Sequence, residues 1–156
     1  MKAVVMAGGE GSRLRPLTLN RPKPMVPMVD RPVMGHIVEL LKRHHITDIV
    51  VTVQYMASVI QDHFGDGSAF GVNITYSLED RPLGTAGSVK RAQDVLSEPF
   101  LVISGDAVTD IDLAQVIERH RTAGAMVTMT LKRVPNPLEF GVAICDDTGF
   151  VRDLVE

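Results

Sequence analysis

Short apolar stretches alternate with amphipathic ones along most of the chain. Five runs rich in valine and isoleucine have the length of strands buried on both faces: Ala3–Met6, Ile49–Val53, Asn73–Leu78, Phe100–Ser104 and Met126–Leu131. Four further stretches show helical spacing of apolar residues: Val33–His44, Ala57–Phe64, Ala86–Leu96 and Leu113–Ala123. Thr85 and Asp112 are candidate N-caps of the last two. The pattern predicts a three-layer α/β fold with a mainly parallel sheet and ligands at the carboxyl ends of its strands.

The last part of the chain has a different pattern. Two strand-like runs, Phe140–Cys145 and Phe150–Val155, are joined by the turn-rich segment Asp146-Asp147-Thr148-Gly149. Such a pattern predicts a β-hairpin. The sequence stops at Glu156 inside the second run, with no capping helix or polar tail. We therefore expect the chain to be a truncated piece of a longer domain.

Composition narrows the class of protein. The 156 residues are 45% hydrophobic and 22% charged, which is typical of a soluble globular domain. A net charge of -3 and 4% aromatic residues argue against nucleic acid as a partner. The apolar stretch at the N-terminus is too short for a signal sequence or membrane span, so we expect no membrane partner and a cytoplasmic protein. The single cysteine, Cys145, excludes an internal disulfide.

A glycine-rich segment, Ala7 to Thr18, directly follows the first strand. Gly8, Gly9 and Gly11 allow positive φ and close approach to a ligand, so that several backbone N–H groups can converge on phosphate oxygens. A Walker A loop would require Gly-Lys-Ser/Thr, and a dinucleotide fingerprint would require Gly or Ala where this chain has Leu14. A phosphate-binding loop and a tight turn beneath a helix both remain open.

Two cations adjoin this segment. Lys23 lies within Pro22-Lys23-Pro24-Met25-Val26-Pro27, and the prolines restrict the backbone and so fix the direction of the lysine. Arg13 lies in the glycine segment itself. Together they would present a planar fork and a point charge to a polyphosphate.

Two further motifs follow predicted strands. Glu79-Asp80-Arg81-Pro82-Leu83-Gly84-Thr85-Ala86-Gly87 joins a strand to a helix, and its glycines would allow the backbone to lie against a flat base. An ordinary capped loop would have the same pattern. Asp106 ends the buried strand Phe100–Ser104, where it could begin a turn or supply an oxygen ligand to Mg²⁺.

The glycine segment and the proline segment together resemble the signature of sugar-1-phosphate nucleotidyltransferases. The matching residues are Gly9-x-Gly11-Ser12-Arg13-Leu14-x-Pro16-Leu17-Thr18 followed by Pro22-Lys23-Pro24-Met25, and the similarity runs from Met1 to Glu156. It is closest to mannose-1-phosphate guanylyltransferases. The resemblance implies a Rossmann-like nucleotidyltransferase fold with a mixed, mainly parallel sheet, of which residues 1–156 are the N-terminal, nucleotide-binding part.

The resemblance also implies a reaction and a set of site residues. A nucleoside triphosphate and a sugar 1-phosphate would give a nucleotide sugar and pyrophosphate, with GTP and mannose 1-phosphate giving GDP-mannose as the best match. Arg13 and Lys23 would be catalytic, and Asp106 would bind Mg²⁺ as cofactor. Nucleotide-binding residues would be Ala7, Gly8, Gly9, Gly11, Ser12, Arg13, Gly84, Thr85, Ala86 and Gly87. Sugar-binding residues would be Glu139, Gly141 and Glu156, although Phe140 replaces the family's commoner tyrosine.

Other functions stay open at this point. Adenylyl-, uridylyl- and thymidylyltransferases acting on glucose 1-phosphate are alternatives, and so is a regulatory subunit that binds nucleotide sugars without turnover. The Leu83–Gly87 segment has the purine-type form, which favours GTP or ATP. After Glu156 the family implies a Lys-Pro pair and a second metal aspartate. Without them we expect the 156-residue chain to be inactive alone and, with sheet edge and apolar surface uncovered, to form a homo-oligomer.

Overall fold

The computed structural model describes residues 1–137 and 140–155, which fall into two compact units, Met1–Ile111 and Asp112–Glu156. The first unit contains β1 (Ala3–Met6), η1 (Ser12–Leu14), η2 (Lys23–Met25), β2 (Pro27–Met28), β3 (Arg31–Pro32), α1 (Val33–Arg43), β4 (Asp48–Val53), α2 (Ala57–Phe64), η3 (Ser68–Phe70), β5 (Asn73–Leu78), α3 (Gly84–Arg91), η4 (Gln93–Val95) and β6 (Leu101–Ser104). The second contains α4 (Leu113–Ala123), β7 (Val142–Cys145) and β8 (Val151–Val155). The units are described separately.

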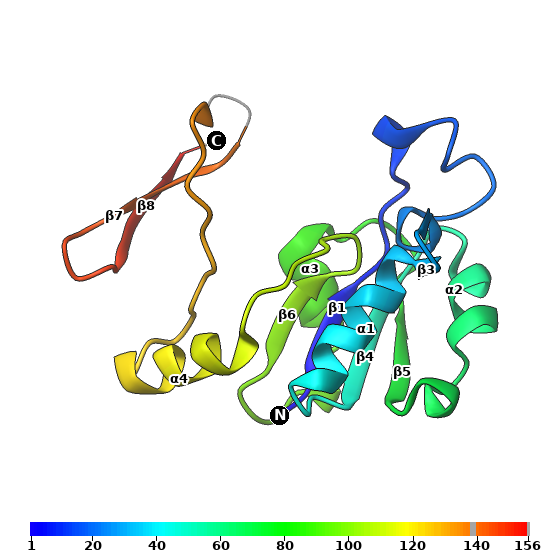
Figure 1. Cartoon of the computed structure of the whole chain (residues 1–156), viewed down its shortest axis with the longest axis horizontal. Coiled ribbons are helices and arrows are strands. Elements are labelled where there is room, and N and C mark those ends of the chain that lie inside the picture. The colour runs from blue at the N-terminus through cyan, green and yellow to red at the C-terminus, as the bar shows by residue number, and fades with distance from the viewer. Residues whose placement is uncertain (138–139, 156) are drawn as a thin grey trace. The chain divides into compact units, whose positions relative to one another are not determined.

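A four-stranded parallel sheet in the order β5-β4-β1-β6 forms the centre of the first unit (Figure 1). From β1 the chain adds β4 and then β5 on one side of β1. It then crosses back and adds β6 on the other side of β1, so the order of the strands reverses at β1. Ligands of open α/β sheets bind at such a reversal, outside the carboxyl ends of the strands. The loops after β1 and β6 are therefore the expected walls of a site.

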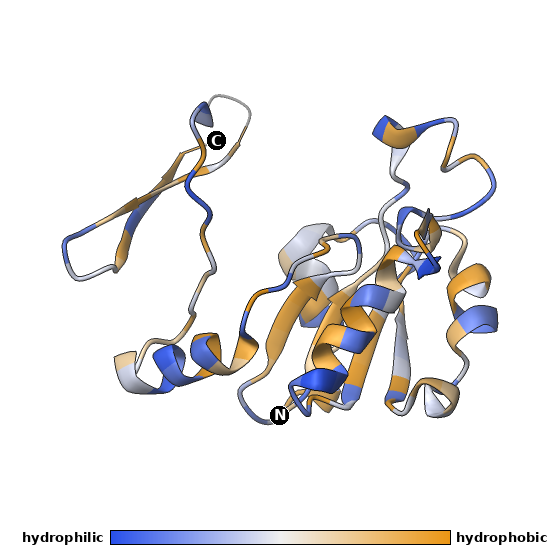
Figure 2. Ribbon diagram, in the orientation of Figure 1, coloured by the Kyte–Doolittle hydropathy of each residue, from blue (hydrophilic) through white to orange (hydrophobic). Residues whose placement is uncertain are grey.

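The core is built from the strand residues predicted to be buried. Val4 of β1 and Val50 of β4 pack with Ala92 on one face of the sheet. Because side chains alternate along a strand, Ala3 and Val5 point to the opposite face, and both are fully buried. Figure 2 shows that β1, β4 and β6 are apolar along most of their length, whereas α1 carries both apolar and polar residues. Val89 of α3 packs against Val4 and Val50 on one face, and Figure 1 shows α1 in front of the sheet, which agrees with the predicted three-layer arrangement.

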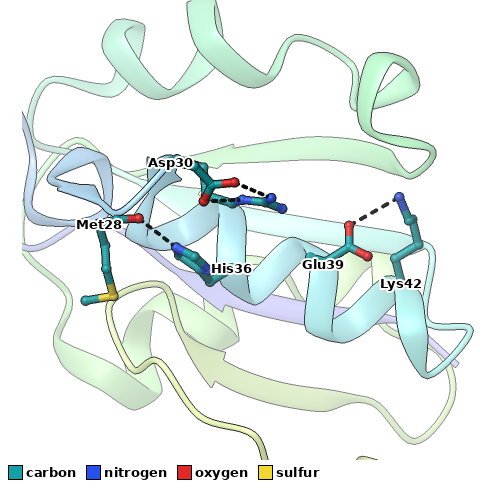
Figure 3. Close-up of polar contacts among 6 residues, drawn as sticks. Met28, Asp30, His36, Glu39 and Lys42 are labelled. Carbon is teal, nitrogen blue, oxygen red and sulfur yellow. Dashed lines mark hydrogen bonds and ion pairs between the residues drawn. The ribbon is translucent and has the colours of Figure 1, made fainter.

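The outer face of α1 is polar (Figure 3). His36 donates from Nε2 to the carbonyl oxygen of Met28 at 3.0 Å, and Lys42 lies 3.3 Å from the Glu39 carboxylate. Seven residues of the same helix are buried: Val33, Met34, Gly35, Ile37, Val38, Leu40 and Leu41. This division between an apolar and a polar face confirms the helix predicted from the sequence.

The remaining predictions for this unit hold with one correction. Four predicted strands are present, with β1 and β5 at the predicted bounds. The third predicted helix begins two residues earlier, at Gly84, and ends at Arg91, followed by the short helix η4. Thr85 is therefore inside the first turn rather than at the N-cap, and Leu83 precedes the helix without a capping side chain.

The second unit contains one helix and one hairpin. Asp112 caps α4 as predicted, since its carboxylate accepts hydrogen bonds from the backbone N–H groups of Ala114 and Gln115. Strands β7 and β8 pair antiparallel, which confirms the predicted hairpin with slightly shorter strands. At its turn, Asp146 accepts hydrogen bonds from the backbone of Thr148 and Phe150 and forms an ion pair with Arg152 at 2.6 Å.

The prediction of a strand at Met126–Leu131 is wrong. No strand is assigned between α4 and β7 in the described part of this unit. Met126 is 98% exposed and Val127 is 76% exposed, so the run neither pairs with a strand nor packs in a core. An apolar, β-branched run becomes a strand only where another strand satisfies its backbone groups. None of the described helices is long and apolar enough to span a membrane.

Candidate functional site

The carboxyl ends of the four parallel strands open onto a cavity of about 510 Å³ in the first unit. Its walls are formed by four groups of residues. They come from the end of β1 and the glycine segment, from the proline segment, from the segment after β5 with the start of α3, and from the end of β6, and Thr52 is added from the end of β4. They are Met6, Ala7, Gly8, Gly9, Gly11, Ser12, Arg13, Leu14, Lys23, Pro24, Thr52, Glu79, Pro82, Leu83, Gly84, Thr85, Ser88, Ser104 and Asp106. The cavity lies where the strand order reverses, as the fold predicts.

The glycine segment is anchored at Gly11. This residue has φ +64°, and a Cβ atom there would lie 2.8 Å from Cβ of Lys23. Thr18, which is 1% exposed, donates from Oγ1 to the Gly11 carbonyl oxygen at 2.9 Å. Gly11 therefore needs glycine both for its backbone conformation and for its contact with the lysine. By contrast, a Cβ at Gly9 would meet nothing within 4 Å.

The proline segment directs Lys23 into the cavity. Pro22 is extended and buried, Pro24 and Met25 are buried, and the short helix η2 is closed by a 2.8 Å bond from the Met25 N–H to the Pro22 carbonyl. The ammonium group of Lys23 lies 2.6 Å from Oδ2 of Asp106. Two motifs about eighty positions apart in the sequence thus meet in one ion pair.

Asp106 is held in its ionised form. Its other oxygen, Oδ1, accepts a hydrogen bond from the Ser104 hydroxyl at 2.5 Å. Partial burial raises the pKa of this carboxyl, but the hydrogen bonds from Lys23 and Ser104 and the charge of Lys23 outweigh it, so the pKa lies below its ordinary value. The end of β6 is tied to β1 by a 2.8 Å bond from the Gly105 N–H to the Met6 carbonyl oxygen. A cationic group already lies against the carboxylate, so these residues fit a cation.

The described residues include no group of three or more His, Cys, Asp or Glu side chains arranged to hold a metal ion. Mg²⁺ commonly takes only one or two protein carboxylates and fills its remaining positions with water and substrate phosphate oxygens. Asp106, with an adjacent hydroxyl and a depressed pKa, has the chemistry of such a partial site.

The segment after β5 and the start of α3 form another wall of the cavity. Gly84 has φ +70°, and its carbonyl oxygen accepts a 2.8 Å hydrogen bond from the Ser88 hydroxyl. Gly84 and Thr85, which the sequence predicts to bind nucleotide, line the cavity together with Pro82, Leu83 and Ser88. Ala86 and Gly87, which were also predicted to bind nucleotide, lie in the same helix α3 but are not part of the lining.

The predicted site residues thus divide into four groups, of which Ala86 and Gly87, in α3 but outside the lining, are one. The cavity brings together Ala7, Gly8, Gly9, Gly11, Ser12, Arg13, Lys23, Gly84, Thr85 and Asp106. Gly141 lies in the second unit and is exposed. Glu139 and Glu156 lie outside the described residues.

Sequence reasoning missed two buried polar residues of the lining, Thr52 and Glu79. Both come at the carboxyl end of a parallel strand, which is the signal that could have identified them. Glu79 is followed by Asp80 and Arg81, and such a charged run is ordinarily exposed.

Comparison with known proteins gives one family. The family described as Nucleotidyl transferase matches residues 2–156. A UTP–glucose-1-phosphate uridylyltransferase of Synechocystis sp. is 40% identical over 96% of this chain and 42% of that protein. A mannose-1-phosphate guanylyltransferase of Mycobacterium tuberculosis is 40% identical over 99% of this chain and 43% of that protein. The chain therefore spans less than half the length of these relatives.

Solved structures agree with the fold. A crystal structure from Bacillus anthracis, assigned as a glucose-1-phosphate thymidylyltransferase and determined with sucrose, superposes with a TM-score of 0.89 at 31% identity. The superposition covers 100% of this chain and 64% of that one.

Proposed function

Because the chain belongs to the Nucleotidyl transferase family, we propose that it supplies the nucleotide-binding part of a sugar-1-phosphate nucleotidyltransferase. One observation carries this proposal. The glycine segment, Arg13, Lys23 and Asp106 line a single cavity at the reversal of the sheet, although they come from three separate parts of the sequence. That cavity combines backbone donors, the two cations Arg13 and Lys23 and the carboxylate of Asp106, with a second carboxylate, Glu79, in its wall. Backbone donors, cations and a metal-binding carboxylate are the chemistry that a triphosphate with its metal requires.

The residues would act by position and charge. N–H groups of the glycine segment would contact phosphate oxygens, and Arg13 and Lys23 would cover the negative charge of the departing pyrophosphate. An oxygen of the sugar phosphate would attack the α-phosphorus of the nucleotide, so the protein need not supply a nucleophile. Arg13 is exposed, and within the described residues it has no hydrogen bond or ion pair, which leaves its guanidinium available to a ligand.

Asp106 would hold Mg²⁺ together with phosphate oxygens of the substrate. When bound, the ion supplies positive charge that neutralises the triphosphate. The Lys23 ammonium already occupies Oδ2 of Asp106, so nucleotide binding would move Lys23 from the carboxylate to the phosphates.

GTP and mannose 1-phosphate, giving GDP-mannose, are the substrates that we propose. The guanylyltransferase relative and the purine-type loop Leu83–Gly87 support this choice. The uridylyltransferase relative, at the same identity, supports glucose 1-phosphate and a pyrimidine nucleotide as the second candidate.

Isothermal titration of the chain with GTP, ATP, UTP and dTTP in the presence of Mg²⁺ tests the proposal. We expect GTP to bind tightest, and we expect Arg13→Ala to weaken binding by about 10- to 100-fold, since a charge-assisted hydrogen bond is worth about 1.5–3 kcal/mol. Arg15→Ala is the matched control, because Arg15 is exposed two residues further along and does not line the cavity. Absence of binding by every nucleotide would refute the proposed function, and tighter binding of UTP or dTTP would refute the choice of GTP.

A further inference from the structure

One edge of the central sheet is apolar and open. Strand β6 ends the strand order β5-β4-β1-β6, and within the described residues it pairs only with β1. None of its four residues is buried, and Val102 is 40% exposed. By contrast, five of the six residues of β4 are buried. β6 therefore has the composition of a strand that is covered on both faces but the surroundings of an edge strand.

The backbone of β6 also has hydrogen-bonding groups on its open side. The N–H of Leu101 donates to the Lys2 carbonyl oxygen at 3.0 Å, and that of Gly105 donates to the Met6 carbonyl oxygen at 2.8 Å. Because successive residues of a strand direct these groups to opposite sides, the N–H and C=O groups of Val102 point away from β1. Natural edge strands are commonly protected against pairing by charged side chains or proline. The stretch from Phe100 to Ser104 contains neither.

The run Met126–Leu131 of the second unit has complementary features. It is uncharged, contains no glycine or proline and is rich in β-branched residues, which is typical of segments that add to a strand edge. It belongs to no sheet in the described part of the chain, and Met126 and Val127 are 98% and 76% exposed. The Thr128 hydroxyl lies 2.9 Å from Nδ1 of His120, which tethers the run to α4. The chain thus carries both an open strand edge and an unpaired strand-forming run.

We propose that two copies of this chain form a symmetric dimer in which the Met126–Leu131 run of each copy pairs with the β6 edge of the other. A foreign strand added to β6 would leave the run uncovered, and a foreign partner on the run would leave β6 open. A second copy covers both surfaces, and a two-fold axis makes the two contacts identical and closed. Residues 107–112 contain no helix or strand, and they supply the flexible connection that an exchange of this kind requires.

The two surfaces match in polarity as well as in hydrogen-bonding capacity. Val102 on the edge and Val127 and Met129 on the run are exposed apolar side chains, and pairing removes them from water. Neither surface carries a charge, so the contact buries no unpaired ion. A single added strand is small compared with the roughly 1,200–2,000 Å² that specific interfaces bury, whereas the dimer contains two such contacts. The homo-oligomer expected from the sequence thereby acquires a defined interface.

Sedimentation velocity of the whole chain over a range of concentrations tests the proposal, with a reducing agent present because Cys145 is exposed. We expect a dimer of twice the 17.0 kDa chain. Val127→Lys should raise its dissociation constant by about 30-fold or more, since the cost of burying an unpaired charge is incurred at both contacts. Val29→Lys is the matched control, because Val29 is 99% exposed in the turn between β2 and β3, outside both surfaces. Its dimer should dissociate as the wild-type dimer does, and far-UV circular dichroism checks that both variants are folded.

Amide hydrogen exchange identifies the surfaces that pair. The amides of Val102 and Met126–Leu131 should be protected at high concentration and should exchange freely after dilution. A wild-type chain that stays monomeric, or a Val127→Lys dimer as tight as the wild-type dimer, would overturn the inference. A monomer in which the Met126–Leu131 amides are protected at every dilution would show pairing within one copy, and it would overturn the inference as well.

Discussion

Replacement of Gly11 by alanine tests the geometry on which the whole site depends. Gly11 has φ +64°, and an added Cβ would lie 2.8 Å from Cβ of Lys23 and 3.2 Å from Cγ2 of Thr18. The left-handed conformation costs an L-residue about 1–2 kcal/mol. Displacing packed neighbours costs about 1–3 kcal/mol more, and the reduced freedom of the unfolded chain returns about 0.4–1 kcal/mol. We therefore expect Gly11→Ala to lower the free energy of unfolding by about 2–4 kcal/mol.

Urea unfolding followed by tyrosine fluorescence measures this change. Both tyrosines of the chain, Tyr55 and Tyr76, lie in the first unit with Gly11, and the chain has no tryptophan. Gly9→Ala is the matched control, because a Cβ there meets nothing within 4 Å. We expect it to change stability by less than about 1 kcal/mol. If Gly9 approaches phosphate, the same control should nevertheless weaken nucleotide binding.

The result that would refute this reasoning is equal stability of the two variants. It would show that the backbone at residue 11 adopts another conformation, or that Lys23 does not pack against it. The described packing of Gly11 against Lys23, and with it the position of Lys23 beside Asp106, would then be wrong.

Three further predictions follow from single contacts. Lys23→Met should raise the pKa of Asp106 towards its ordinary value. It should also increase the affinity for Mn²⁺ without nucleotide by about fivefold, since a partly exposed ion pair is worth about 1 kcal/mol. NMR titration of the carboxyl group measures the pKa and paramagnetic resonance measures Mn²⁺ binding, and unchanged values would contradict the ion pair. Arg13→Ala should leave the urea midpoint unchanged, and a loss above about 1 kcal/mol would show a structural role. Hydrogen bonds from Thr148 and Phe150, with Arg152, lower the pKa of Asp146 from 3.8 to about 2. The ionised carboxylate therefore stabilises the hairpin fully at a pH above 3.8, and this stabilisation is lost as the pH falls towards 2. Amide hydrogen exchange of β7 and β8 should show this loss, and Asp146→Asn should remove the pH dependence.

Hydrophobic pattern predicted the sheet and the helices well because burial is encoded locally in these segments. β1 and β5 have the predicted bounds, and α1 divides into apolar and polar faces as its spacing indicates. Met126–Leu131 shows the limit of this reasoning. Its composition suits a strand, but a strand also needs a partner, and pairing is a property of the fold rather than of the segment.

The site was predicted in part, for a related reason. Residue type and spacing in the glycine and proline segments indicated phosphate chemistry, and the cavity brings both segments together with Asp106. The 2.6 Å contact between Lys23 and Asp106 depends on the position of β6 beside β1, which the local pattern does not contain. Glu79 was not predicted because its neighbours in the structure, Gly8 and Val53, are far from it in the sequence.

The central claim is that the cavity at the ends of β1, β5 and β6 binds a nucleoside triphosphate. The most direct test is titration of the ¹⁵N-labelled chain with GTP and Mg²⁺, with the backbone amide resonances followed by NMR. The account predicts that the largest shifts occur in Gly8–Arg13 and Leu83–Thr85, whereas Glu39 and Lys42, on the outer face of α1, change little. Largest shifts at Glu39 and Lys42, or no shifts in the glycine segment at saturating GTP, would contradict it.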